Sequence, residues 1–160
     1  SFEIRWGEEF EVLPLTREKE IEIGEFLLRV GAPLLPDCAD GTLAGATYYV
    51  QRLFDHHKDD PHFELAPKAS CMVYGRATRQ LVGVCLLGGG GPHGSLFGIY
   101  DLVVDPSFRG RELRHKMVQR ALTVLAEHDM PKLHLWHEDS SPEVSFYQEL
   151  GFVPTGEVER

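Results

Sequence analysis

The sequence predicts a single α/β (α+β) domain over residues 1–160, in which a mixed, mainly antiparallel central sheet is flanked by helices. Three short β-type runs, 69–74, 81–87 and 96–104, follow one another with turn residues between them, which predicts an antiparallel meander. After Pro106 the apolar residues change to a helical period. A chain of 160 residues, 42% hydrophobic and 26% charged, is long enough for one folded core.

The first half of the chain alternates between apolar periodic runs and breaker residues. Thr16 is expected to cap the first helix, and Gly31 with Pro33 ends it. The proline-, aspartate- and glycine-rich run after that helix predicts a loop that borders a substrate cleft. The expected elements are a strand over 10–15, a helix over 21–30, a loop over 32–45 and a helix over 46–57.

The second half predicts two further helices with strands between and after them. The first helix has its apolar residues on one face: Leu113, Met117, Val118, Ala121, Leu122 and Leu125. A strand is predicted over 133–137. The second helix is opened by Ser141-Pro142-Glu143 and closed by Gly151, and a last strand begins at 152–153.

Charge and composition limit the function classes. The formal net charge of -9 argues against a nucleic-acid partner and favours a cationic small-molecule or peptide partner. The longest apolar stretch, 81–100, is interrupted by a glycine run, and the N-terminus lacks the order of a signal peptide. We therefore expect a cytoplasmic protein with no membrane partner. Its three scattered cysteines predict neither a disulfide framework nor a metal site.

Basic residues are concentrated at the start of the helix after Pro106. Between Arg109 and Arg120, five basic residues stand against one acid, Glu112. The N-terminus of a helix presents unsatisfied backbone N–H groups and the positive end of the helix dipole, which attract anions. The pattern favours a polyphosphate site, and the alternative interpretation is a solvated basic helix face.

The run from Leu102 to His115 resembles the GNAT superfamily, in which a strand ending Val-x-Pro precedes an Arg/Gln-x-x-Gly-x-Gly/Ala loop. The run from Ser145 to Phe152 resembles the family's Phe-Tyr-x-x-x-Gly-Phe segment. With the order of elements, the resemblance covers most of residues 10–153. It implies the acyl-CoA N-acyltransferase (GNAT) fold and acetyl transfer from acetyl-CoA, as the acyl donor, to a primary amine of a small molecule or peptide.

The resemblance also implies roles for individual residues. Tyr147 occupies the position that resembles the family's general acid, and a phenol with its ordinary pKa of about 10 is able to protonate a departing thiolate. The alternative role of Tyr147 is that of an aromatic core residue on the last helix. Asp101, Glu138 and His137 are candidates for the general base. No metal site is expected, since the paired histidines point to different faces. The residues expected to bind the coenzyme are Leu102, Val103 and Val104 on the strand and Arg109, Gly110, Arg111, Glu112, Leu113, Arg114 and His115 in the loop and helix.

The sequence departs from the family pattern at two positions of the loop. Glu112 and Arg114 stand where the motif has small residues that let the backbone approach the phosphates. The alternative function is therefore a catalytically impaired GNAT-fold binding or regulatory module. Only eight residues follow Phe152, so a second copy of the chain, in a homodimer, or the N-terminal run 2–6 is expected to cover the last sheet edge.

Overall fold

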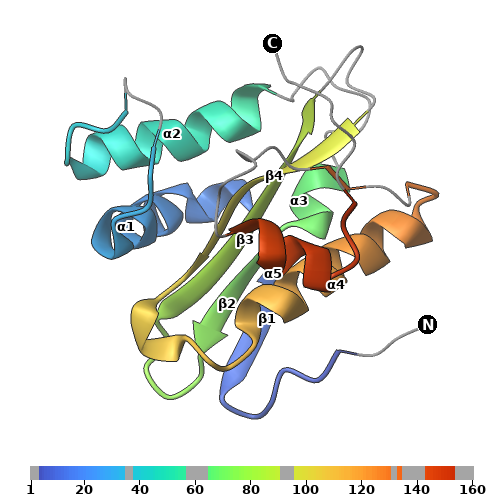
Figure 1. Ribbon diagram of the computed structural model, residues 1–160. Coiled ribbons are helices and arrows are strands. Elements are labelled where there is room, and N and C mark those ends of the chain that lie inside the picture. Colours follow the sequence, from blue (N-terminus) through green and yellow to red (C-terminus); the bar gives the residue numbers. More distant parts are fainter. Residues whose placement is uncertain are drawn as a thin grey trace.

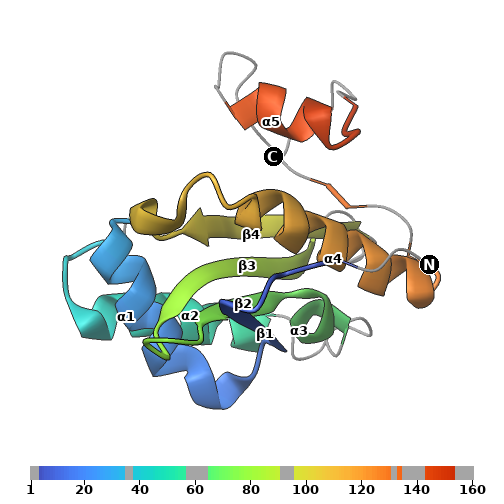
Figure 2. The ribbon, with the colours of Figure 1, turned by 90° about the horizontal axis from the view of Figure 1, so that it is seen from below.

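The computed structural model describes residues 4–34, 38–56, 65–90, 96–130, 133–134 and 143–153. One sheet forms the middle layer (Figure 1). Helices α1 (Glu20–Val30) and α2 (Leu43–His56) lie on one side of it, and α4 (Leu113–Glu127) and α5 (Glu143–Glu149) lie on the other (Figure 2). The predicted fold class, a sheet flanked by helices, is confirmed.

The sheet contains four antiparallel strands in the order β1-β2-β3-β4. The meander of β2, β3 and β4 confirms the prediction, and β1 extends it by pairing Phe10 with Gly75. A parallel bridge joins Gly98 of β4 to His134, which makes the sheet mixed but mainly antiparallel. The strands span Phe10–Pro14 (β1), Cys71–Gly75 (β2), Leu81–Gly90 (β3) and Leu96–Val104 (β4).

Each face of the sheet carries its own apolar core, and successive residues of β3 belong to different cores. Val84 and Leu86 pack with α1 and α2, whereas Cys85 and Leu87 pack on the side of α4. A strand that is buried on both faces needs a continuous apolar run, and β3 has one. The α1–α2 core includes Ile23, Phe26, Leu27, Tyr49 and Val50; the α4-side core includes Phe10, Val73, Leu113, Met117, Val118, Ala121, Leu125 and Tyr147.

Helices α1 and α2 begin and end at short polar or glycine signals. A 3₁₀ turn, Arg17–Lys19, precedes α1, and the side chain of Thr16 makes no capping hydrogen bond, contrary to the prediction. Gly31 ends α1 in the left-handed region, at φ +70°. Helix α2 begins at residue 43, three residues earlier than predicted, because the Thr42 hydroxyl accepts a hydrogen bond from the N–H of Gly45 at 3.0 Å.

The two helices approach closely at Gly24. A Cβ atom on Gly24 would lie 2.8 Å from the backbone nitrogen of Thr47, and backbone atoms have no free rotation by which to move aside. The contact fixes α2 against α1 at a point two residues before Tyr49, which faces the sheet. Glycine at position 24 is therefore a packing requirement of the helix pair.

We expect Gly24→Ala to destabilise the fold by about 1–3 kcal/mol, because an inserted methyl group in a full interface forces the helices apart. The same substitution in an open helix stabilises by about 1 kcal/mol, so the sign of the change separates the two cases. Chemical denaturation measures it. Glu25→Ala, on the exposed face of the same helix, is the matched control; a Gly24→Ala protein that gains stability would contradict the close contact.

A short helix, α3 (Leu65–Ala69), is an element that the sequence analysis did not predict, and β2 begins at Cys71 rather than at Ala69. The buried Ser70 hydroxyl donates to the carbonyl of Ala66 at 2.7 Å and accepts from the N–H of Leu87 at 2.9 Å. The Arg120 guanidinium of α4 donates to the carbonyls of Lys68, Ala69 and Ser70 at 2.9–3.3 Å. Contacts from distant elements thus complete the end of α3.

The predicted apolar face of α4 is confirmed, since five of its six residues are buried and Leu122 is half-buried.

Of the strand predicted over 133–137, only residues 133–134 lie within the described part. The strand predicted to begin at 152–153 is wrong at these two residues. Gly151, at φ +95°, turns the chain back, and the N–H of Phe152 donates to the carbonyl of Tyr147 at 3.0 Å.

Candidate functional site

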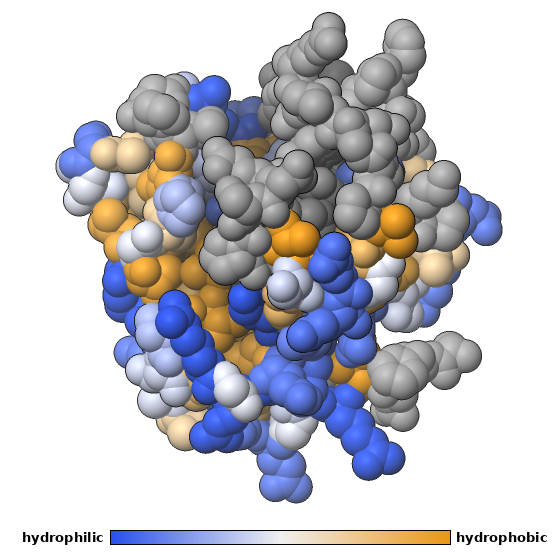
Figure 3. Space-filling view, in the orientation of Figure 1, coloured by the Kyte–Doolittle hydropathy of each residue, from blue (hydrophilic) through white to orange (hydrophobic). Residues whose placement is uncertain are grey.

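Strand β4 contains a β-bulge at Tyr100. Asp101 lies opposite Leu86 and Ile99 lies opposite Leu87, so Tyr100 is an extra residue between the two pairs. On its outer edge, the N–H of Ile99 donates to the carbonyl of His134 at 3.2 Å. Within the described ranges, no strand pairs with the outer edge from residue 101 to 104. Figure 3 shows apolar surface beside this segment, between α1–α2 and α4–α5.

The connection from β4 to α4 is held in a fixed shape. The Asp105 carboxylate accepts a hydrogen bond from the N–H of Ser107 at 2.9 Å and pairs with Arg29 of α1 at 2.7 Å, which lowers the pKa of Asp105. Gly110 then adopts φ +86°, with no atom within 4 Å of the place of a Cβ. These contacts anchor the turn and leave open space at Gly110.

The first turn of α4 presents backbone N–H groups outward. Glu112 is the N-cap residue at φ +59°, and the first intrahelical hydrogen bond runs from the N–H of Lys116 to the carbonyl of Glu112 at 3.1 Å. The N–H groups that precede Lys116 in the turn therefore point beyond the end of the helix, where the helix dipole is positive. This geometry is suited to an anion such as a diphosphate.

The basic residues around this turn do not act as one cluster. Arg111 forms an ion pair with Glu9, and Arg120 donates to the end of α3. The Arg114 guanidinium lies over the ring of Phe146, with 4.0 Å between its central carbon and the ring centroid. Three of the basic residues that are close in the sequence thus make three separate structural contacts. Arg109 stays exposed at the mouth of the turn.

Helix α5 is attached to the start of α4 through aromatic side chains. The His115 and Phe146 ring centroids lie 4.7 Å apart, and His115 also lies 3.9 Å from the carboxylate of Glu149. Tyr147 is 5% exposed and packs edge-to-face between Phe146, at 4.9 Å, and Phe152, at 5.5 Å. The phenol of Tyr147 is consequently held beside the helix whose first turn is suited to an anion.

The buried carboxylate of Asp101 faces α2. It is 7% exposed, and its Oδ2 accepts a hydrogen bond of 2.6 Å from the Tyr49 hydroxyl. Burial raises the pKa of Asp101 to about 7, and the hydrogen bond from Tyr49 opposes that rise. A carboxyl group with a pKa near neutrality is able to accept a proton during catalysis.

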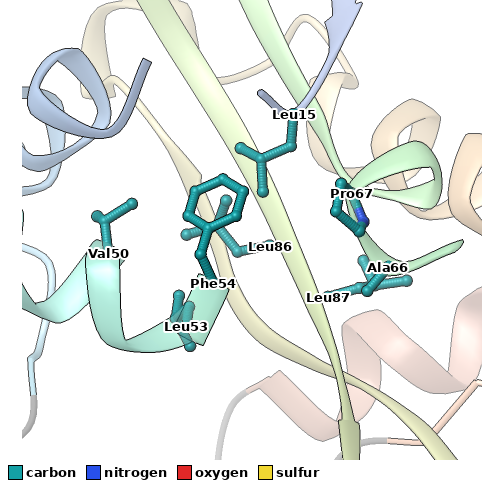
Figure 4. A pocket seen from close by; sticks show the side chains of 8 residues that line it. All are labelled: Leu15, Val50, Leu53, Phe54, Ala66, Pro67, Leu86 and Leu87. Carbon is teal, nitrogen blue, oxygen red and sulfur yellow. The ribbon is translucent and has the colours of Figure 1, made fainter. Parts of the chain in front are cut away.

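An apolar pocket of about 20 Å³ lies between α2, α3 and β3 (Figure 4). Leu86, which is opposite Asp101 in the sheet, forms one wall, and Val50, which follows Tyr49 on α2, forms another. The side chains that line it are all apolar: Leu15, Val50, Leu53, Phe54, Ala66, Pro67, Leu86 and Leu87. None of these side chains carries a titratable group.

The bulge of β4 and the start of α4 lie in a part of the chain that matches a known protein family. The Acetyltransferase (GNAT) family matches residues 42–152. The chain belongs to the GNAT family. The matched span holds the bulge, the turn before α4 and the aromatic cluster of α5.

Solved GNAT structures share the fold at low sequence identity. An acetyltransferase of Trypanosoma brucei is 19% identical, with a TM-score of 0.59, and the match covers 94% of this chain and 97% of that one. The ribosomal-protein-S5-alanine acetyltransferase of Vibrio fischeri is 15% identical, with a TM-score of 0.67 and coverages of 96% and 83%. The glucosamine-6-phosphate N-acetyltransferase of Arabidopsis thaliana is 15% identical, with a TM-score of 0.57 and coverages of 96% and 97%. The search of curated proteins gives no significant match.

The two departures from the GNAT motif are accommodated locally. The side chain of Glu112 is exposed and accepts no hydrogen bond from the start of α4, so it does not fill the anion position. Glu112 nevertheless adopts the left-handed conformation that glycine prefers. Arg114 turns toward Phe146 and α5. The side chains that replace the small residues thus leave the backbone turn in place.

The predicted site residues fall on both sides of β4. Asp101 and Val103 face the α1–α2 core, and Leu102 and Val104 face the α4 side with Tyr147. Leu113 is 2% exposed, so only its backbone is able to face an anion. Glu138 and His137 lie outside the described residues. Sequence reasoning missed Tyr49 as a site residue; its signal was a tyrosine on the apolar face of a helix.

Other kinds of site were not found in the described part of the chain. The described residues contain no group of three His, Cys, Asp or Glu side chains that could hold a metal ion. Cys38, Cys71 and Cys85 are buried, and none of the three forms a disulfide bond. None of the described helices has the length and apolar character that crossing a bilayer requires.

Proposed function

We propose that the chain is an acetyl-CoA-dependent N-acetyltransferase acting on a primary amine of a small molecule or peptide. The observation that carries the proposal is the arrangement along β4. A buried carboxylate with a pKa of about 7 lies on this strand, beside a strand edge that pairs with no described strand from residue 101 to 104. The chain then continues through Gly110 to a helix start that is suited to a diphosphate.

On the donor side, the coenzyme diphosphate binds the N–H groups from Gly110 to His115, with Arg109 exposed beside them. The backbone of Leu102, Val103 and Val104 hydrogen-bonds the pantetheine arm, because an unpaired strand edge has donors and acceptors to offer. The acetyl thioester then lies near the bulge. The turn and the strand edge are continuous in the chain, which suits a long, flexible donor.

Acetyl transfer proceeds by direct attack of the amine on the thioester carbonyl. A carbon–nitrogen bond forms and the carbon–sulfur bond breaks. Asp101 accepts the proton from the amine nitrogen, and the Tyr147 hydroxyl donates a proton to the departing thiolate. The products are an amide and free coenzyme A, and proton exchange with water then returns Asp101 to the carboxylate and Tyr147 to the phenol.

The acceptor is a cationic amine. The chain carries a formal net charge of -9, although basic residues are concentrated around the donor turn, so acidic groups dominate elsewhere. Such a field attracts a cation and is weakened by salt over a Debye length of about 10 Å at about 0.1 M. The apolar pocket beside Leu86 has room for only a small apolar group of that amine.

Calorimetric titration with acetyl-CoA, followed by an assay of coenzyme A release with a panel of primary amines, tests the proposal. The panel contains an alkyl monoamine, a diamine and a peptide with a free N-terminus. Binding of acetyl-CoA together with amine-dependent release supports an N-acetyltransferase. Binding without release with any amine favours the impaired binding module, and absence of binding contradicts both functions.

Replacement of Glu112 by glycine is expected to tighten acetyl-CoA binding by about tenfold or less. The substitution removes a negative charge beside the diphosphate and replaces a strained residue at φ +59° with one that adopts this conformation readily. Calorimetry with wild type and Glu112→Gly measures the ratio. Glu112→Gln is the matched variant, because it removes the charge and keeps the Cβ. Weaker binding by the glycine variant would show that the carboxylate supports the turn.

A further inference from the structure

We infer that Tyr49 is a positioning residue that holds Oδ2 of Asp101 and leaves Oδ1 to take the proton from the acceptor amine. The inference rests on the proposed function, because Asp101 is the general base in that proposal. It adds a residue from α2, 52 positions away in the sequence, to the catalytic arrangement on β4.

The geometry assigns different tasks to the two oxygens of Asp101. Oδ2 receives the Tyr49 hydroxyl at 2.6 Å, and both residues are 7% exposed. Oδ1 has no hydrogen-bond partner among the described residues, yet it is not one of the polar side-chain atoms closed off from solvent. One oxygen is therefore occupied by a rigid partner, and the other remains available to a proton donor from outside.

Tyr49 is itself held in place from both sides of its helix turn. Ala46 is fully buried and Val50 is 1% exposed, and α2 is fixed against α1 at the close contact between Gly24 and Thr47. The phenol is thus not free to rotate away without opening the α1–α2 core. A restrained donor keeps the carboxylate in one orientation, which a mobile partner such as water would not do.

The charges around the pair leave Tyr49 as the main partner of Asp101. The titratable groups that interact electrostatically with the pair are Tyr100 from β4, Cys38 before α2, where Arg52 lies 3.9 Å from the Cys38 sulfur, and Cys85, which lies on the opposite face of β3. Burial raises the pKa of Cys85, and burial together with Asp101 raises the pKa of Tyr49, so both stay protonated at neutral pH. For Asp101, burial raises the pKa and the Tyr49 hydrogen bond lowers it.

Tyr49→Phe tests the inference by two measurements. The first is the pKa of Asp101 from the pH dependence of its carboxyl ¹³C chemical shift in the free protein, assigned with Asp101→Asn. The second is the pH profile of kcat/KM, with acetyl-CoA and the amine that wild type accepts best in the panel. Tyr48→Phe is the matched control, since Tyr48 is its neighbour on α2 and is 52% exposed.

We expect Tyr49→Phe to raise the pKa of Asp101 and to move the acidic limb of the rate profile in the same direction. The loss in kcat/KM is about tenfold at pH 7 and is recovered near about pH 9, where the carboxyl group is ionised again. Tyr48→Phe should leave both measurements unchanged. Ionisation of the acceptor amine contributes the same acidic limb to the pH profile of every variant. The difference between two profiles therefore reports the ionisation of Asp101.

An unchanged pKa of Asp101 in Tyr49→Phe would overturn the inference. A raised pKa without a shift of the rate profile would also overturn it, because Asp101 would then not take the proton. In both of these cases wild type is active, and the proposed function stands. Wild type that transfers no acetyl group to any amine of the panel contradicts the proposed function itself, and the positioning role is lost with it.

Discussion

Asp101→Asn is expected to lower the turnover number for acetyl transfer by about 10²- to 10⁴-fold, the usual contribution of general acid–base catalysis. The amide is similar in size and is able to accept the hydrogen bond from Tyr49, but it is unable to take a proton from the amine. The acidic limb that belongs to Asp101 should disappear from the pH profile. Asp55→Asn, an exposed aspartate on α2, is the matched control and should keep full turnover.

The same variant should not be less stable than wild type above pH 7. The folded-state pKa of Asp101 is about 7, well above the ordinary 3.8, so between these values the folded protein holds a proton that the unfolded chain has lost. The free energy of unfolding of wild type therefore falls as pH rises through this window, by an amount on the order of 4 kcal/mol. Asparagine carries no such cost. Denaturation at about pH 5 and about pH 8 measures the part of this fall that lies between the two pH values, about 2–3 kcal/mol. A variant that is less stable than wild type at the higher pH would indicate a structural role for the carboxylate.

The local periodicity of apolar residues correctly predicted the elements that bury a face formed by their own apolar residues. The apolar spacing of α4 placed Leu113, Met117 and Leu125 correctly, because a helix with 3.6 residues per turn brings them to one face. The continuous apolar run of β3 and the turn residues around it likewise predicted the meander. These signals lie within a few residues of one another.

The elements that were missed depend on partners distant in the sequence. Helix α3 has five residues with Pro67 at its middle, and its last carbonyls are satisfied by Arg120. No periodic pattern fits in so short a segment. Thr42, in contrast, was a readable signal: a threonine just before an apolar helical run is a preferred N-cap, and it marks the true start of α2.

The candidate site could be predicted in its backbone but not in its side-chain partners. The run from Arg109 to His115 predicted a helix start suited to an anion, and the structure places outward-pointing N–H groups there. Its basic residues, however, pair with Glu9, with the end of α3 and with Phe146. The contact of Tyr49 with Asp101 joins α2 to β4 through tertiary packing alone. Spacing along the chain carries no information on such pairs.

Tyr147→Phe is expected to lower the turnover number by about 10²- to 10⁴-fold while the affinity for acetyl-CoA stays nearly constant. Only the departing thiolate needs the phenolic proton, whereas the coenzyme is held by the backbone of β4 and α4. Phenylalanine keeps the ring, and with it the edge-to-face contacts to Phe146 and Phe152. Steady-state kinetics should therefore show a fall in kcat, and calorimetry should show an unchanged dissociation constant for acetyl-CoA.

Phe152→Leu separates the chemical role of Tyr147 from its packing role. It removes the ring that lies 5.5 Å from the Tyr147 ring and keeps the phenol, so it should lower the free energy of unfolding with a much smaller effect on kcat. Tyr147 is 5% exposed and packs among aromatic side chains, so packing alone would explain its presence on α5. If Tyr147→Phe keeps full turnover, Tyr147 has only this packing role. A large fall in kcat with the ring and the coenzyme affinity retained requires the hydroxyl group to act on the leaving thiolate.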